Sequence, residues 1–216
     1  LTDAEMHFQN IKRVVENDLK NQEISIEDST LEPAFLCELY GIQGRLDILE
    51  LSQTNKHQKI IELKSGGVPF PDDGISIKPN HKSQLYLYYQ LIALLQKIDF
   101  HKVSSQIDGY ILYSKIAQTN LRYDKPTLSQ VQEILNLRNK IIINEYYLTL
   151  DDITITKEII AKITHDNLIN GSNVNPNFRQ NYIEPQINEV IQPFQHLEEI
   201  EENYFYSFIS FIAKEQ

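Results

Sequence analysis

Acidic, basic and amide side chains recur in three segments of this chain, in an order that suits the cleavage of a phosphodiester bond. The segments are residues 41–47, 60–64 and 84–88, with sequences GIQGRLD, IIELK and QLYLY. If the first two are neighbouring strands and the third opens a helix, an Asp, a Glu, a Lys and a Gln meet at one point. Carboxylates at such a point hold a divalent cation, which activates water and neutralises charge on the phosphate.

The alternation of apolar and polar residues predicts two strands, at residues 46–49 and 59–63, joined by a polar turn. If a two-residue turn is centred on Thr54 and Asn55, the residues seven positions to either side face each other across the two strands. A longer turn would shift this register by one residue and separate them.

Asp47 and Glu62 are the residues that this register brings face to face. Directly opposed side chains have Cβ atoms roughly 4.5–5.5 Å apart, and like charges at that distance are destabilising. Either one pKa is raised or a cation lies between the two carboxylates, and we expect the cation. Because side chains alternate along a strand, Lys64 shares the face of Glu62, whereas Leu63 points into the other layer.

A helix over residues 80–96 carries the third segment, with Asn80 as its predicted N-cap after Pro79. Gln84 and Tyr88 are four residues apart and therefore share one face of this helix. Gln84 would lie in the first turn, where unpaired backbone N–H groups favour a phosphate.

Taken together, Gly-x-x-Gly-Arg-x-Asp, Glu-x-Lys and Gln-x-x-x-Tyr resemble the motifs of the PD-(D/E)XK nucleases, specifically the RecB-like branch. The resemblance is strongest to the nuclease domain of helicase–nucleases that trim Okazaki flaps. It covers roughly residues 32–147, including a predicted strand at 107–113 and a predicted helix over 127–147. Each motif alone has an ordinary reading, such as a tight turn at the glycines or a capped turn at the Asp.

The resemblance implies a role for each matched residue. Asp47 and Glu62 would bind Mg²⁺ or Mn²⁺ together with the backbone carbonyl of Leu63. Lys64 would position or activate the attacking water and offset charge on the scissile phosphate. Gln84 and Tyr88 would shape the site and contact the substrate, so the catalytic set is Asp47, Glu62, Lys64 and Gln84.

Three further side chains are candidates. RecB-like enzymes commonly place a metal-binding His on an early helix, and His7, in a helix predicted over residues 2–19, is the one histidine before Asp47. His7 either binds the metal, which would favour manganese over magnesium, or is an ordinary surface or core histidine. We expect Arg45 to contact backbone phosphate or form a salt bridge, and His81 to contact phosphate or cap the helix.

Composition sets the remaining limits. Flap-trimming relatives often carry four cysteines that hold an iron–sulfur cluster, whereas this chain has only Cys37. A single cysteine rules out an internal disulfide and fits a reducing cytoplasm. The longest apolar run, near residues 91–95, is too short to span a bilayer, so we expect no membrane association.

The net charge of −10 is unevenly distributed. Residues 41–82 contain six Lys/Arg and five Asp/Glu, a balance of +1, so the rest of the chain carries −11. A bound dication would make this region positive. We therefore expect modest, salt-sensitive affinity for nucleic acid from this chain alone, with a larger assembly capturing the substrate.

The predicted fold is α/β, with a restriction-endonuclease-like core in which helices flank a central mixed sheet. Its elements are expected in the order helix, three strands, helix, strand, with the strand at 35–40 first and extra helices at the C-terminal end. Residues 1–170 form the nuclease domain, 171–184 a linker or mobile loop, and 185–216 a C-terminal helical segment. That segment is too aromatic to stand alone, so we expect it to pack on this domain or on a neighbouring one. It resembles the lead-in to a helicase module in the flap-trimming group.

These observations predict a magnesium- or manganese-dependent nuclease acting on single-stranded or flap DNA. It would be the nuclease part of a helicase–nuclease in DNA replication or repair. Two alternatives remain: an RNA endonuclease on the same scaffold, and a non-catalytic interaction module with an acidic surface and an aromatic tail.

Overall fold

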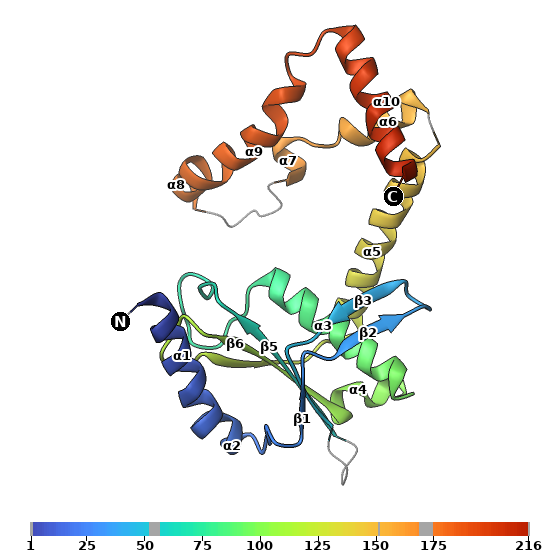
Figure 1. Cartoon of the computed structure of the whole chain (residues 1–216). Helices are drawn as coiled ribbons and strands as arrows, with labels where there is room; N and C mark the ends of the chain where they lie inside the picture. The colour runs from blue at the N-terminus through green and yellow to red at the C-terminus, as the bar shows by residue number, and fades with distance from the viewer. Residues whose placement is uncertain (1, 52–56, 151, 169–174, 216) are drawn as a thin grey trace. The chain divides into compact units, whose positions relative to one another are not determined.

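A mixed five-stranded sheet forms the centre of the N-terminal part of the chain (Figure 1). The strand order is β1-β4-β5-β6-β7, in which β5 and β6 run parallel and all other neighbours run antiparallel. With helices flanking this sheet, the predicted α/β class with a central mixed sheet is confirmed. The strands are β1 (Ser29–Leu31), β4 (Ile48–Leu51), β5 (Gln58–Lys64), β6 (Ile107–Tyr113) and β7 (Leu121–Asp124).

This computed structural model describes residues 2–51, 57–150, 152–168 and 175–215. The chain divides into two compact units, Leu1–Ile134 and Leu135–Gln216. In the described residues, no helix is both long and apolar enough to cross a membrane. The main helices are α1 (Asp3–Arg13), α2 (Leu19–Asn21), α3 (Pro79–Leu95), α4 (Phe100–Gln106), α5 (Leu128–Leu148), α6 (Ile153–Ile160), α7 (His165–Leu168), α8 (Pro176–Phe178), α9 (Glu184–Ile191) and α10 (Glu199–Glu215).

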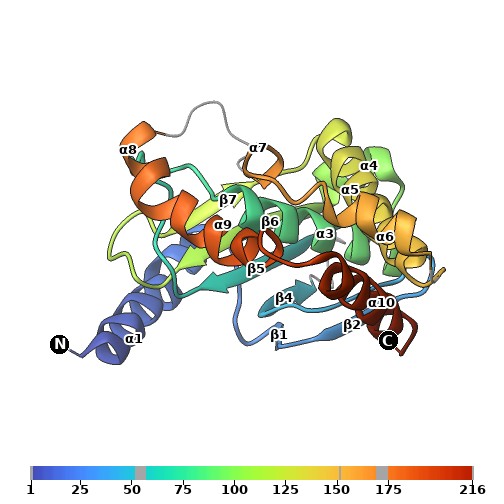
Figure 2. The same cartoon turned by 90° about the horizontal axis from the view of Figure 1, so that it is seen from above.

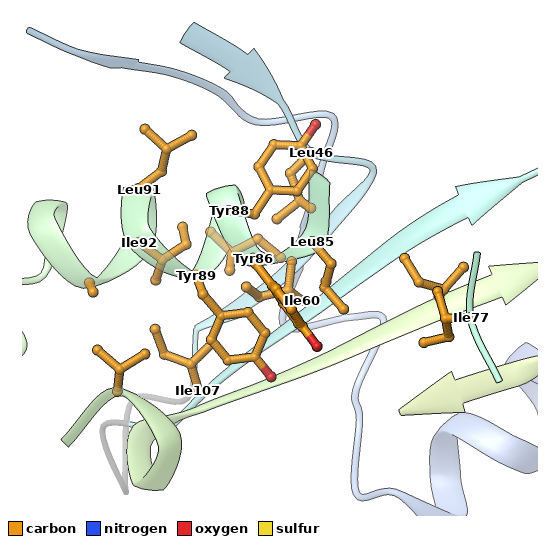
Figure 3. Close-up of a cluster of buried hydrophobic side chains, with 14 of the residues drawn as sticks. Leu46, Ile60, Ile77, Leu85, Tyr86, Tyr88, Tyr89, Leu91, Ile92 and Ile107 are labelled. Carbon is orange, nitrogen blue, oxygen red and sulfur yellow. The ribbon is translucent and has the colours of Figure 1, made fainter. Parts of the chain in front are cut away.

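The two faces of the sheet have separate cores. Ile60 of β5 is buried against α3, in a cluster that includes Leu85 and Tyr89 (Figure 3). Ile61, the next residue, is buried on the other face with Val14 and Leu19, which follow α1. Because successive side chains of a strand point to opposite faces, the odd-numbered face of β5 meets the N-terminal helix and the even-numbered face meets α3.

Helix α3 begins one residue earlier than predicted. Pro79 is its first residue, Lys78 is the N-cap, and no side chain caps the helix. The prediction of Asn80 as N-cap was wrong, because the fixed φ of proline suits the first helical position and places Asn80 inside the first turn. The predicted strand at 107–113 and the helix over 127–147 are confirmed as β6 and α5.

The chain before β4 differs from the prediction in two ways. The strand expected at 35–40 is β2 (Ala34–Cys37), which pairs with β3 (Ile42–Arg45) in a separate two-stranded sheet. The segment 41–47 is therefore not one strand with β4, because β3 ends before the buried Leu46 and β4 begins after Asp47. Among the residues that the structure describes before α3, there are five strands rather than the predicted three.

The predicted register between the two motif strands is confirmed. Ile48 pairs with Ile61 and Leu51 with Gln58. Continuing this antiparallel register by one residue beyond the Ile48–Ile61 pair places Asp47 beside Glu62. The turn predicted at Thr54 and Asn55 lies outside the described residues.

In the second unit, α6 and α10 lie side by side in both views (Figures 1 and 2). The hydroxyl groups of Thr156 and Ser210 are 3.0 Å apart at their buried contact, and Lys157 pairs with Glu202 at 3.1 Å. Within the segment predicted as a linker, residues 176–184 are helical, and residues 171–174 lie outside the described part of the chain.

Close packing of α3 on β6 makes Gly109 a sensitive position. A Cβ at Gly109 would lie 2.5 Å from Cε2 of Tyr89, whereas one at Gly66 would meet nothing within 4 Å. We expect Gly109→Ala to lower the free energy of unfolding by about 1–3 kcal/mol through overpacking. Gly66→Ala, the matched control, should change it by less than about 0.5 kcal/mol. Urea unfolding followed by circular dichroism measures both, and equal effects would contradict the packing of α3 on β6.

Candidate active site

Asp47 lies in the two-residue gap between β3 and β4, at the point where the chain passes from one sheet to the other. Its Oδ2 accepts a hydrogen bond of 2.6 Å from the backbone N–H of Leu63. This bond joins Asp47 to β5 one residue beyond Glu62 and fixes the carboxylate at the edge of the sheet.

Glu62 is 4% exposed and lies on the face of β5 that packs against α3. Its Oε1 accepts two hydrogen bonds, from Lys64 Nζ at 2.8 Å and from Gln84 Nε2 at 2.7 Å. Its Oε2 is buried and has no hydrogen-bond partner among the described residues. A buried carboxylate oxygen without a donor is costly, so this atom is positioned to accept a ligand.

Lys64 and Gln84 contact each other as well as Glu62. Lys64 Nζ donates to Gln84 Oε1 at 2.7 Å, so the amide of Gln84 accepts from the ammonium and donates to the carboxylate. The three groups form a closed set of charge-assisted hydrogen bonds between β5 and α3. The prediction that Lys64 shares the face of Glu62 is confirmed.

Tyr88 connects this set to the chain before Asp47. Its hydroxyl donates to the carbonyl oxygen of Arg45 at 2.6 Å and accepts from Gln84 Nε2 at 3.2 Å. A Cβ at Gly44 would lie 3.1 Å from Cε1 of Tyr88, so the glycine lets β3 approach the ring closely. The Gly-x-x-Gly-Arg-x-Asp and Gln-x-x-x-Tyr motifs are thus parts of one contact.

The electrostatics of the site follow from burial and from the two carboxylates. Burial raises the pKa of Glu62, the hydrogen bond from Lys64 lowers it, and the nearby Asp47 carboxylate raises it again; the net direction is upward. Burial is also the main cause of the raised pKa of Tyr88, which keeps its hydroxyl protonated as a donor.

The structure places Arg45 and His7 at the edge of this arrangement. Arg45 forms an exposed salt bridge with Glu32 at 3.4 Å, one of the two roles predicted for it. His7 Nδ1 lies 2.7 Å from Ser114 Oγ, and this hydroxyl is 3.2 Å from the carbonyl oxygen of Lys64. Its role as a metal ligand stays a prediction.

The residues present fit a hard divalent cation in part. Within the described ranges, no group of three or more His, Cys, Asp and Glu side chains is gathered to hold a metal ion. The predicted donor set instead combines two carboxylates, Asp47 and Glu62, with the backbone carbonyl of Leu63. All three donors are oxygens, which Mg²⁺ and Mn²⁺ prefer, and the unpaired Oε2 of Glu62 supplies one of them.

Two residues that the sequence did not single out support the site. Tyr113 pairs in register with Lys64 on the neighbouring strand and bonds to His81 Nδ1 at 2.9 Å. Arg122 has a fully buried guanidinium that donates to Asp72 at 2.6 Å and to the carbonyl of Ser76, so it holds the loop before α3. An Arg in a short strand gives no sequence signal of such burial.

An apolar recess of about 210 Å³ opens beside Asp47 on the face of the sheet opposite α3. Its walls come from the N-terminal helix, β1, β4, β5 and β6, and include Ile11, Leu31, Ile48, Leu63 and Leu112. Asp47 and Glu32 contribute the carboxylates at this recess.

Comparison with known proteins adds no family assignment: no family model matches the chain, and no curated protein is significantly similar to it. The likeness to RecB-like nucleases therefore stays an interpretation of the motifs and the geometry.

The raised pKa of Glu62 predicts a pH effect on stability without metal. A folded-state pKa above the unfolded value means that the folded protein binds the proton more tightly. The stabilisation is complete below the unfolded-state pKa and is lost as pH rises through the folded-state value. In EDTA, the free energy of unfolding of the wild type should therefore fall relative to Glu62→Gln as pH rises from about 4 to 8. Glu16→Gln, at an exposed helix position, is the control and should show no such divergence. A constant difference in urea unfolding across this range would contradict the burial of Glu62.

Proposed function

We propose that this chain is a divalent-metal-dependent nuclease with a restriction-endonuclease-like core, which hydrolyses phosphodiester bonds of single-stranded or flap DNA. The observation that carries the proposal is the Glu62 carboxylate, buried beside Asp47 with one oxygen bonded to Lys64 and Gln84 and the other unpaired. Lys64 offsets the charge through Oε1, whereas the buried Oε2 remains an unsatisfied acceptor that a bound cation would satisfy.

Asp47, Glu62 and the carbonyl of Leu63 would hold Mg²⁺ or Mn²⁺, with His7 as a further ligand. When bound, the metal would lower the pKa of water and neutralise charge on the phosphate. Glu62 and Asp47 then act as ligands rather than as nucleophiles, and no side chain needs to form a covalent bond to the substrate.

Lys64 would act on the phosphate. Its ammonium is held by hydrogen bonds to Glu62 and Gln84, so the side chain has one orientation. It therefore loses little conformational entropy when substrate binds. A positioned cation next to the scissile group stabilises the negative charge that develops there, and it orients the attacking water. Gln84 orients Lys64, and Tyr88 orients both Gln84 and the chain leading to Asp47.

The recess beside Asp47 supports a single-stranded substrate. An apolar cavity of about 150 Å³ in another protein holds a benzene ring, so a recess of about 210 Å³ has room for a flat base. A base enters such a recess only when it is unpaired, which a single strand or a flap provides.

The C-terminal unit supports an assembly with another module. Helix α10 exposes a row of aromatic side chains: Tyr204, Phe208 and Phe211 are 73, 47 and 56% exposed. Large exposed aromatic rows are typical of surfaces that another domain covers. A helicase module in the same full-length protein, acting in DNA replication or repair, would supply both this cover and the capture of substrate.

The proposal predicts cleavage of a single-stranded DNA oligonucleotide in Mg²⁺ or Mn²⁺ and none in EDTA. Asp47→Ala and Lys64→Ala should each lower the rate by at least about 100-fold, because each removes charge from the reacting centre. Asp28→Ala and Lys12→Ala remove the same charges from exposed positions and should leave the rate unchanged.

Retained cleavage by a purified Asp47→Ala/Lys64→Ala double variant would show that the activity comes from a contaminant or another site. A matched RNA oligonucleotide, digested in parallel, separates a DNA nuclease from an RNA nuclease on the same scaffold.

Metal binding can be tested without substrate. Because a ligand that binds the folded state stabilises it, Mn²⁺ at 100 times its Kd should add about 2.7 kcal/mol to the stability of the N-terminal unit. Differential scanning calorimetry should show this rise in Tm for the wild type and for Asp28→Asn, and its loss for Asp47→Asn. A folded wild type that neither shifts in Tm nor binds Mn²⁺ by titration calorimetry would instead indicate a non-catalytic interaction module.

A further inference from the structure

We propose that His81 is held as a neutral imidazole that donates its Nε2–H to a phosphate of the substrate, next to the phosphate that Lys64 contacts. The inference rests on the proposed nuclease function and assigns one more residue to substrate binding. Its evidence is the hydrogen-bond chain from Lys78 through Tyr113 to His81.

Two structural relations place His81 beside the site, one through helix α3 and one through strand β6. It precedes Gln84 by three residues on α3, so the two side chains share a helix face. Its ring partner Tyr113, at a centroid distance of 5.5 Å, pairs in register with Lys64 on the neighbouring parallel strand. Side chains at paired positions project from the same face of the sheet, so Tyr113 and His81 extend the row of Glu62 and Lys64 towards the start of α3.

The buried hydroxyl of Tyr113 determines the form of His81. Tyr113 is 0% exposed, so its O–H cannot donate to bulk water. Its oxygen accepts the backbone N–H of Lys78 at 3.2 Å and lies 2.9 Å from His81 Nδ1. Among the contacts of the described residues, Nδ1 is the acceptor within reach of this buried O–H, so we assign the hydroxyl hydrogen to that contact. Nδ1 therefore accepts and carries no proton, which places the single proton of the ring on Nε2.

Protonation of the ring would break this chain. An Nδ1–H would face the Tyr113 oxygen, and the Tyr113 O–H would then lie buried with no acceptor, at a cost of about 1–3 kcal/mol. The positively charged groups around His81 also disfavour protonation of its ring. Lys64 comes from β5 and Lys78 from the loop before α3, and the guanidinium of Arg122 lies 5.3 Å from the centre of the Tyr113 ring.

The pKa of His81 agrees with this geometry. Burial lowers it most, and Lys64 and Lys78 lower it further. Lys82, on the same turn of α3, pairs with Asp124 at 2.9 Å. Near neutral pH, His81 is therefore an uncharged donor of fixed orientation, and Lys64 is the cation next to it.

Nuclear magnetic resonance tests the tautomer directly. Long-range ¹H–¹⁵N spectra at pH 7.5 should show His81 with a protonated Nε2 and an unprotonated Nδ1, assigned by the signals lost in His81→Asn. Its pKa should lie below the ordinary 6.5 and rise towards that value in Tyr113→Phe, which lacks the donor. A protonated Nδ1, or a pKa that does not move in Tyr113→Phe, would overturn the inference.

Two substitutions separate donation to phosphate from a structural role. Asn places an oxygen near Nδ1 for Tyr113 but has no donor near Nε2, whereas Gln places an N–H donor near Nε2. We expect His81→Asn to raise KM about tenfold, equivalent to about 1.4 kcal/mol, and His81→Gln to raise it less than about threefold, with kcat little changed in both. Rescue by Asn rather than Gln would show that His81 serves packing alone.

A separate measurement distinguishes this inference from the proposed function. If the wild type cleaves no substrate, the nuclease proposal fails. The phosphate contact is then decided by adding a thymidine oligonucleotide in EDTA and following the His81 Nε2–H signal. A shift in the wild type that is absent with the unphosphorylated nucleoside supports the contact, and no shift overturns it.

Discussion

The buried carboxylate of Glu62 is the interaction on which the site depends. Its Oε1 is the common acceptor for Lys64, two residues along β5, and for Gln84 on α3. A charge that is nearly out of contact with water is tolerated only when donors surround it, so strand and helix must dock in one relative position. The Tyr88 hydroxyl accepts from Gln84 and donates to the carbonyl oxygen of Arg45, so it also fixes the backbone two residues before Asp47. The five motif residues are therefore interdependent, and a substitution at one of them should displace the others.

Much of this could be predicted because it follows from local periodicity. Alternation along residues 58–64 places Glu62 and Lys64 on one face of the strand. The four-residue interval between Gln84 and Tyr88 places these two side chains on one face of the helix. The pairing of Asp47 with Glu62 was predicted from a two-residue turn centred on Thr54 and Asn55, and the strand register agrees with it. In the structure, a slip of one residue would exchange the buried Glu62 with the 37% exposed Leu63, so these two positions distinguish the registers.

The parts that could not be predicted depend on contacts between residues far apart in sequence. The break at residues 46–47 occurs because Leu46 is drawn into the cluster under α3, which a strand pattern does not reveal. The start of α3 at Pro79 follows from proline geometry, which outweighed the capping preference of Asn80. Arg122 and Tyr113 gave no signal, because their roles come from contacts with a loop and a helix 32 or more residues away.

The same arrangement explains how an acidic chain of net charge −10 can present a site suited to phosphate. Long-range fields between exposed charges are screened beyond about 8–10 Å, so the groups within one Debye length decide the local potential. The three charged groups of the proposed site, Asp47, Glu62 and Lys64, sum to −1, which a dication would convert to +1. A neutral His81, as proposed above, keeps that balance, since a protonated ring would add a second positive charge near Lys64. In the proposed nuclease, the site would therefore gain a donor for phosphate without adding charge, and the metal and a partner covering α10 would supply the attraction for the substrate.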